Sequence, residues 1–531
     1  MKNFLLALSS GILLALGWPT YGFPLLLFFA FVPLLFLEFR LRKSAVKRAG
    51  WKTFGWAYLS FFIWNVITSY WIYFSTPTGG IFAILANSLL MTLVFTLYHW
   101  VAKRVNFTAA CSFLASLWIC FEYLHLHWEF SWPWLNLGNA FSEFTDWVQW
   151  YEYTGTFGGT LWIWIVNLSI FRAVVLFQQH RERPIVYRAI LRNALLILVP
   201  IGLSYLIFIN YEVKTNKITQ INILQPNINP YTEKYFTSDQ KIASLLEKMT
   251  DEKTTESTDL LLMPETVFAS GTKINGFQNS PAHQFSENTL DKFPNLNVLG
   301  GISFFKWIRE KDKKTSQSNR YRPGLWLNDY NSAFMIRRDT SDQIYHKSKL
   351  VVGVENFPYK DVLKPVLGDI MIDLGGTVSM KTTQENREVF SLKNGSKAAP
   401  IICYESVYGE YVSKYVRNGA DFLTIITNDA WWGNTQGHLQ HFSYAKLRAV
   451  ETRRDVVRSA NTGISGIINQ KGEVVKKMGY NQQGSLTGEV HLNSEKTFYV
   501  KFGDLIARVS QFLVVFIFLF AIVKFRKGDE F

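Results

Sequence analysis

The chain has 531 residues, of which 48% are hydrophobic, 16% are aromatic and only 18% are charged, against roughly 25% charged residues in an average soluble domain. This length excludes a single small domain. The formal net charge of +14 is typical of a nucleic-acid-binding protein or of a membrane protein with basic cytoplasmic loops, so the positions of the charges must decide between these two classes.

Long apolar segments lie in the N-terminal part of the chain and near its C-terminus. Residues 4–39 are interrupted at residues 18–22 and predict two membrane spans, although a cleaved signal peptide is an alternative for the first of them. Each further run is close to the ~20 residues that cross the hydrocarbon core of a bilayer. Six further runs bring the number of predicted spans to eight. These six runs cover residues 53–74, 81–101, 107–125, 157–179, 190–210 and 505–523.

Lysine and arginine residues give the predicted spans an orientation. Basic clusters follow the second, fourth, sixth and eighth spans, whereas the loops at residues 75–80 and 126–156 contain neither Lys nor Arg. Because basic loops stay in the cytoplasm, both termini are expected there. We therefore expect seven spans in residues 1–211, an external domain in residues 212–502, and the eighth span with a cytoplasmic tail in residues 503–531. This distribution of charge argues against nucleic acid as a partner.

The predicted external domain has the pattern of an α/β fold. Polar stretches at residues 238–249 and 443–454 have helical periodicity, and residues 306–322 are expected to form an exposed loop. Short runs rich in β-branched and other apolar residues predict strands. They lie at residues 218–224, 259–263, 296–304, 332–336, 399–403, 422–427 and 466–469.

Ionisable side chains follow three of these predicted strands. Glu265 comes after the strand at 259–263, Cys403 ends the strand at 399–403, and Asp429 follows the strand at 422–427. Lys347 lies between the first two in the sequence. Because sites in α/β folds gather at strand ends, these residues are candidates for one site.

Cys403 can be a buried structural residue or a nucleophile. The other two cysteines, Cys111 and Cys120, lie in predicted spans, so Cys403 has no disulfide partner in its own domain. No cluster of Cys and His has the spacing of a zinc site, so no metal is expected. A catalytic thiol needs a base and a cation, which Glu265 and Lys347 would supply if the fold brings them together. Alone, Glu265 could equally cap a helix, and Lys347 could be a solvated surface residue.

The order Glu…Lys…Cys resembles the nitrilase superfamily, and the whole chain is similar to its membrane-embedded branch, the N-acyltransferases that act on lipoproteins in bacterial inner membranes. The segment Leu-Val-Val-Gly-Val-Glu at residues 350–355 departs from that family, because many members have a proline and Phe-Gly before the glutamate that corresponds to Glu355. The matching strings are Leu-Gln-Pro-Asn-Ile at 224–228, Pro-Glu at 264–265, Asp-Tyr-Asn-Ser at 329–332, Tyr-His-Lys at 345–347, Ile-Cys-Tyr-Glu at 402–405, Thr-Asn-Asp-Ala-Trp-Trp-Gly at 427–433, Arg-Ser-Ala-Asn-Thr-Gly at 458–463, and Phe-Ser-Trp-Pro-Trp-Leu at 130–135.

The resemblance implies a multi-span α-helical membrane protein with an inserted nitrilase-like domain, an αββα sandwich. It implies transfer of an acyl chain from a phospholipid of the bilayer to the N-terminal amine of a diacylated lipoprotein, in the bacterial inner membrane. The catalytic domain would face the periplasm, and no cofactor is expected. A membrane-anchored amidase, and a receptor or transporter with an inert nitrilase-like sensor domain, are the alternatives.

The resemblance also implies roles for individual residues. Cys403 would form a thioester with the acyl chain, Glu265 would act as general base, and Lys347 would stabilise the oxyanion with help from backbone N–H groups near Tyr404. Glu355 would position Lys347. Asn331 and Glu405 are further supporting candidates.

Overall fold

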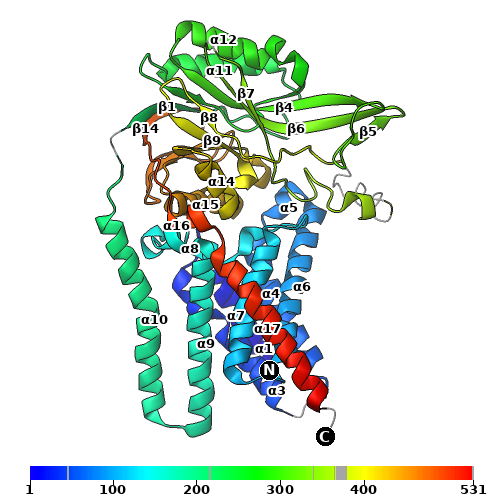
Figure 1. The fold of residues 1–531 in the computed structure, drawn as a ribbon, viewed down its shortest axis with the longest axis vertical. Helices are drawn as coiled ribbons and strands as arrows, with labels where there is room; N and C mark the ends of the chain where they lie inside the picture. Colours follow the sequence, from blue (N-terminus) through cyan, green and yellow to red (C-terminus); the bar gives the residue numbers. More distant parts are fainter. Residues whose placement is uncertain (45–46, 215–216, 339, 364, 366–378, 529–531) are drawn as a thin grey trace. The chain divides into compact units, whose positions relative to one another are not determined.

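A computed structural model of the protein describes residues 1–44, 47–214, 217–338, 340–363, 365 and 379–528. The chain divides into two compact units. The helical unit comprises Met1–Tyr73, Pro77–Asn210 and Phe502–Phe531, and the α/β unit comprises Phe74–Thr76 and Tyr211–Lys501 (Figure 1).

The helical unit consists of long apolar helices. Six helical segments among the described residues are long and apolar enough to cross a membrane. Two more predicted spans coincide with the helices at Lys2–Leu16 and Ala49–Ser69. The long helices are α1 (Lys2–Leu16), α3 (Val32–Lys43), α4 (Ala49–Ser69), α6 (Pro77–Ala102), α7 (Phe107–His125), α9 (Thr156–His180), α10 (Arg183–Asn210) and α17 (Leu505–Gly528); α2 (Leu27–Ala30), α5 (Ile72–Ser75) and α8 (Tyr151–Thr154) are short.

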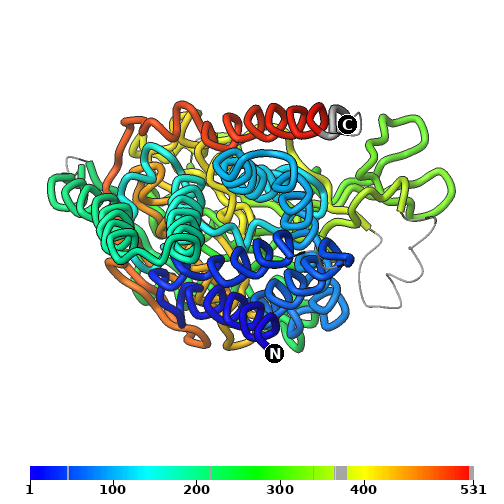
Figure 2. Tube along the Cα trace, turned by 90° about the horizontal axis from the view of Figure 1, so that it is seen from below, coloured from blue at the N-terminus to red at the C-terminus, as the bar shows by residue number. Residues whose placement is uncertain are grey.

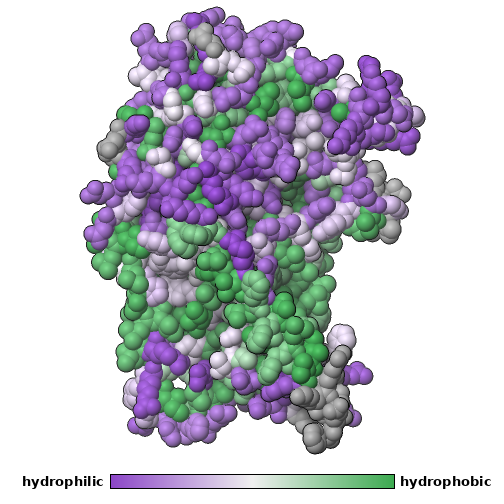
Figure 3. Space-filling model, in the orientation of Figure 1, coloured by the Kyte–Doolittle hydropathy of each residue, from purple (hydrophilic) through white to green (hydrophobic). Residues whose placement is uncertain are grey.

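The surface of these helices is that of a membrane protein. Large apolar side chains are exposed along them, including Leu198 on α10 and Phe516 on α17, and the space-filling view shows apolar surface over this unit (Figure 3). Helices α9 and α10 pack side by side, as the view along the helices also shows (Figure 2). Such extensive exposed apolar surface is unstable in water and stable in lipid.

The break predicted near residue 20 is a tight turn between α1 and the next helical segment. Gly22 N donates to Trp18 O, and Phe23 N donates to Leu16 O at 2.8 Å. A Cβ on Gly22 would lie 2.1 Å from Leu16 O, so the turn closes only with glycine at this position. The apolar run therefore forms two helical segments rather than one.

The α/β unit contains two sheets of eight and six strands among its described residues. In the six-stranded sheet, β9, β10 and β11 are parallel neighbours, and all six residues of β10 are buried, as expected for a parallel strand covered on both faces. The first sheet comprises β1 (Ile218–Gln225), β2 (Leu260–Leu262), β3 (Phe268–Lys273), β4 (Asn297–Arg309), β5 (Asn319–Arg322), β6 (Leu325–Ile336), β7 (Gln343–His346) and β14 (Gly484–His491). The second comprises β8 (Phe390–Ser391), β9 (Lys397–Ile402), β10 (Phe422–Thr427), β11 (Val456–Ala460), β12 (Ser465–Ile468) and β13 (Val474–Met478).

Helices cover the outer faces of the two sheets, which pack against each other through β1 with β11 and β6 with β9. Helices α11 and α12 contact the first sheet, and α14 and α15 contact the second. The unit is therefore an αββα sandwich, which confirms the predicted fold class (Figure 1). The helices of this unit are α11 (Asp239–Lys253), α12 (Pro281–Lys292), α14 (Gly409–Arg417), α15 (Gln436–Thr452) and α16 (Phe498–Phe502).

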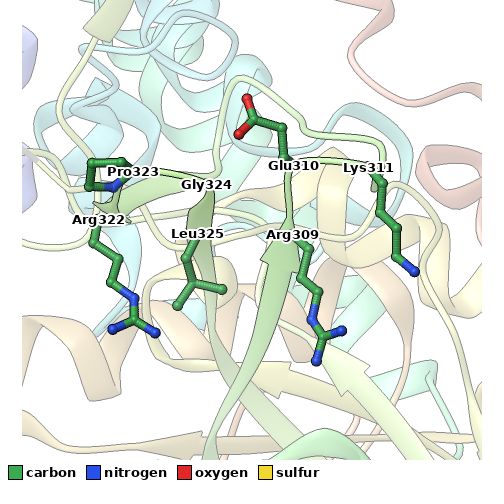
Figure 4. Close-up of a pocket in the computed structure, with 7 residues that line it drawn as sticks. All are labelled: Arg309, Glu310, Lys311, Arg322, Pro323, Gly324 and Leu325. Carbon is green, nitrogen blue, oxygen red and sulfur yellow. The ribbon is translucent and has the colours of Figure 1, made fainter.

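The prediction of a loop at residues 306–322 was wrong at both of its ends. Strand β4 continues to Arg309, and β5 begins at Asn319. The register with β6 continues to the tip, where Ile308 lies opposite Trp326, so cross-strand pairing sustains the strand in spite of its polar composition. The hollow at this tip (Figure 4) contains none of the candidate catalytic residues. It is lined by Arg309, Glu310, Lys311, Arg322, Pro323, Gly324 and Leu325.

Candidate active site

Cys403 lies directly after the buried strand β9, in a short turn at Cys403–Val407. Its backbone is left-handed, with a φ of +51°, a conformation that costs energy for a residue other than glycine. Its carbonyl oxygen accepts a hydrogen bond from Ser406 Oγ at 2.7 Å and lies 3.2 Å from His441 Nε2. The surrounding contacts thus hold the thiol-bearing residue in a strained conformation at the end of the strand.

Glu405 anchors the same turn from inside the protein. Its carboxylate is fully buried. Oε1 accepts hydrogen bonds from the hydroxyls of Tyr345 and Tyr411 and from Ser348 N. Oε2 accepts from Ile402 N at 2.8 Å. The carboxylate therefore fixes the backbone on the N-terminal side of Cys403.

Glu265 follows β2 and is also buried. Asn331 Nδ2 donates to its Oε1 at 2.7 Å, and Asn428 N donates to its Oε2 at 3.1 Å. Lys347 Nζ lies 3.0 Å from Oε1. Both oxygens thus have hydrogen-bond donors, which fix the position of the carboxylate.

Lys347 is buried between two carboxylates. Its Nζ lies 3.0 Å from Glu265 Oε1 and 2.9 Å from Glu355 Oε2. Burial disfavours the ammonium charge, but the two carboxylates outweigh this effect and raise the pKa of Lys347 well above its usual value. Burial likewise opposes the charge of Glu355, yet Lys347 and the N–H of Val351 lower the pKa of Glu355. The lysine is therefore a fixed cation.

The Cys403 thiol stays protonated in the resting site. Burial raises its pKa, the charge of Glu265 raises it further, and Lys347 opposes the shift. A thiol in this state becomes a nucleophile only when a base removes its proton during attack. Glu265 is a carboxylate whose charge acts on this thiol.

The structure brings together most of the residues selected from the sequence. Asn331 bridges both carboxylates, because its Nδ2 also donates to Glu355 Oε1 at 3.0 Å. Glu355 keeps its contact with Lys347 despite the unusual segment before it. Tyr404 is buried and packs against Tyr408 with 5.2 Å between ring centroids.

A second buried network was not predicted. His441 Nδ1 lies 3.0 Å from Asp429 Oδ1, and Arg458 donates to Asp429 Oδ2 at 2.7 Å. Burial opposes the charge of Asp429, but Arg458 and His441 lower its pKa. Among the described residues no group of His, Cys, Asp and Glu could hold a metal ion.

Lys234 is a further residue of the site that the sequence did not indicate. It lies in a turn-rich segment after β1, is only 6% exposed, and donates from Nζ to Thr266 Oγ1. Burial lowers its pKa to about 8, although the charges of Glu265, Cys403 and Glu355 act in the opposite direction. A single lysine among polar residues gives no local signal of burial.

The sequence matches two known families. Residues 220–498 match the family described as Carbon-nitrogen hydrolase, and residues 10–169 match the Apolipoprotein N-acyltransferase N-terminal domain. A Chlorobaculum tepidum protein named apolipoprotein N-acyltransferase is 27% identical over 99% of this chain and 97% of its own length. A Thermotoga maritima protein with the same name is 27% identical over 97% of this chain and 93% of its own length.

The structure is also similar to solved structures of the nitrilase superfamily. A Saccharomyces cerevisiae member of branch 10 of that superfamily aligns over 57% of this chain and 96% of its own chain. The sequence identity is 15% and the TM-score is 0.36.

Proposed function

We propose, from the premise that the chain belongs to the carbon–nitrogen hydrolase family and within it to the apolipoprotein N-acyltransferases, that it transfers an acyl chain from a membrane phospholipid to the N-terminal amine of a diacylated lipoprotein. The observation that carries this proposal is the buried cluster of Glu265, Lys347 and Glu355, in which the charges of Glu265 and Lys347 act on the Cys403 thiol. The apolar helices distinguish the chain from a soluble amidase.

The first half-reaction acylates the cysteine. Glu265 takes the proton from Cys403 Sγ while the sulfur attacks the ester carbonyl of the phospholipid. The tetrahedral intermediate collapses, the bond between the carbonyl carbon and the glycerol oxygen breaks, and Glu265 returns the proton to that oxygen. A lysophospholipid leaves, and the acyl chain remains on Cys403 as a thioester.

The second half-reaction transfers the acyl chain to the amine. The neutral amine of the lipoprotein attacks the thioester, and Glu265 accepts a proton from the nitrogen. The carbon–sulfur bond breaks, and the sulfur of Cys403 recovers its proton. An amide is formed and the free thiol is restored.

Lys347 stabilises the negative oxygen that forms in both steps. A positioned donor of this kind contributes roughly 3–4 kcal/mol to the transition state. Asn331 and Glu355 fix its position through the hydrogen bonds described above. The N–H groups near Tyr404 are the backbone donors that complete this role.

The membrane supplies both substrates. We place the protein in the bacterial inner membrane, with seven spans in residues 1–211, an eighth in residues 503–531, and the catalytic domain at residues 212–502 on the periplasmic side, on the basis of its basic clusters. An acyl donor that already lies in the bilayer needs no soluble carrier. The chemistry uses side-chain and backbone groups of the chain itself, without a cofactor or metal.

Intact-mass spectrometry of the purified full chain after incubation with phospholipid alone tests this proposal. We expect one added acyl mass on the wild type and none on Cys403→Ala. Cys120→Ala, which removes a cysteine of the helical unit, is the matched control and keeps the adduct. Addition of a diacylated lipopeptide should remove the adduct and release a triacylated product. A folded wild type that gains no acyl mass in excess lipid would overturn the proposal.

A further inference from the structure

Lys234 is a buried cation without a carboxylate partner among the described residues. Its Nζ has one hydrogen bond there, to Thr266 Oγ1, and forms no ion pair. An ammonium has three N–H donors, so two of them remain for another partner. Buried charges are normally paired, and this lysine is therefore an exception that requires a cause.

The backbone around Lys234 is well defined. Lys234 N donates to Asn229 O at 2.9 Å, and the Glu233 carboxylate accepts from Asn229 N at 2.9 Å. Glu233 is thus engaged within its own turn. Tyr231 packs on Trp431 with 5.2 Å between ring centroids. The segment holds the lysine inward by its own hydrogen bonds.

The ammonium also lies near the catalytic cluster. The charges of Glu265, Lys347, Glu355 and Cys403 all act on it, and its hydrogen-bond partner Thr266 follows the proposed base directly. Asn428, whose backbone N–H holds Glu265, has a buried side-chain nitrogen that lacks a partner within the described part of the chain. Two buried donors therefore lie beside Glu265 with hydrogen-bonding capacity that this part of the chain leaves unused.

Lys234 and Lys347 differ in their surroundings. Lys347 contacts two carboxylates at 3.0 and 2.9 Å, whereas Lys234 contacts a neutral hydroxyl. Lys347, which is already paired with two carboxylates, gains little from a further permanent anion. Lys234 has no carboxylate partner among the described residues, so it is the better partner for an anion that the substrate carries throughout binding.

We propose that Lys234 binds the phosphate of the donor phospholipid while its ester carbonyl lies at Cys403. This inference rests on the proposed function and names the part of the donor that the site recognises. In a glycerophospholipid only the three-carbon glycerol links the acyl esters to the phosphate, so an ester and the phosphate can reach neighbouring residues. Lysine is an established phosphate ligand that acts as a point charge.

The two half-reactions then differ in their need for Lys234. The phospholipid donor carries a phosphate, whereas the diacylated cysteine that accepts the acyl chain has none. A residue that stabilised the oxyanion would act in both steps. A phosphate ligand acts on the acylation of Cys403 and mainly through the KM of the donor.

The test compares two donors that differ only in the phosphate headgroup, 1-palmitoyl-2-oleoyl-phosphatidylglycerol and 1-palmitoyl-2-oleoylglycerol. Intact-mass spectrometry follows the acylation rate of the full chain in detergent micelles against donor concentration. We expect Lys234→Gln to raise the KM for the phospholipid about tenfold or more, and to raise it far less for the diacylglycerol. Lys234→Arg should preserve the preference of the wild type. Lys241→Gln, at an exposed lysine of α11, is the matched control.

The outcomes separate this inference from the proposed function. Equal losses with both donors, or an equal slowing of thioester aminolysis, would overturn the phosphate role. A wild type that accepts both donors equally would overturn it without any variant, so the test survives if Lys234→Gln does not fold. A wild type acylated by neither donor would instead overturn the proposed function.

Discussion

The buried carboxylate of Glu405 offers a sharp test of how the nucleophile is held. It accepts hydrogen bonds from Tyr345, Tyr411 and Ser348 on one oxygen and from Ile402 on the other. Glu405→Gln preserves the shape of the side chain but replaces one acceptor oxygen by a donor NH₂ group. Whichever way the amide turns, at least one donor of the protein then faces a donor of the amide.

The cost can be estimated from these contacts. Hydrogen bonds to a charged group contribute about 1 kcal/mol more than neutral ones, and a buried donor without an acceptor costs about 1–3 kcal/mol. Three weakened bonds and one lost bond give a destabilisation of about 4–6 kcal/mol. In a domain of this size each kcal/mol shifts the Tm by about 2–4 °C. We therefore expect the Tm of the α/β unit to fall by roughly 10–20 °C.

The assay uses the buried thiol of the same turn. In a Cys111→Ala, Cys120→Ala background, Cys403 is the remaining cysteine, so a thiol-reactive dye reports unfolding of the α/β unit on heating. Glu388→Gln, at an exposed glutamate, is the control and should melt like its parent. A change of less than about 3 °C for Glu405→Gln would refute the reasoning, because three weakened hydrogen bonds and one lost hydrogen bond at a buried side chain should cost more than that.

Three further predictions follow from individual contacts. Gly301→Ala should slow acylation about 100-fold and lower the Tm, because its Cβ would lie 2.3 Å from Thr266 N beside the base; Gly276→Ala, which has open space, should match the wild type in both measurements. The KM for phospholipid should be constant below about pH 8 and rise above it, as the ammonium of Lys234 loses its proton; Lys234→Arg should abolish this rise, and a rise that persists would contradict the assignment. Asp429→Asn leaves a buried guanidinium unpaired and should cost about 3–5 kcal/mol at neutral pH. Because the pKa of this carboxyl is lowered by folding, its stabilisation is complete above the unfolded pKa and declines as the pH falls, so denaturant titrations should show the variant approaching the wild type from about pH 5 to about pH 3.

Much of the fold could be predicted because its strands are buried on both faces. Apolar runs at residues 259–263, 399–403 and 422–427 coincide with β2, β9 and β10, and their side chains need no alternation. The segment at residues 306–322 failed this rule, because the end of β4 and the strand β5 within it are largely exposed and polar. Its stability comes from pairing with β6, which no local pattern reveals.

The site was only partly accessible to the same reasoning. Glu265 and Cys403 follow strands, and strand ends can be read from the sequence. The contact of Glu355 with Lys347, eight residues earlier, depends on how the intervening segment folds back. Lys234 lies in a polar segment that predicts exposure, and only the tertiary structure buries it beside Thr266.

The charges of the cluster bear directly on the proposed role of Glu265 as the base. Glu265 and Glu355 face one ammonium, Lys347, at hydrogen-bonding distance, so a thiolate formed by loss of a proton to water would add a third negative charge in a buried site. Transfer of that proton to Glu265 instead keeps the total charge constant while the sulfur attacks. It also removes one of the two charges that engage Lys347, at the moment when a negative oxygen forms on the substrate. In the proposed mechanism, the same proton transfer therefore activates the nucleophile and makes the cation available to the oxyanion.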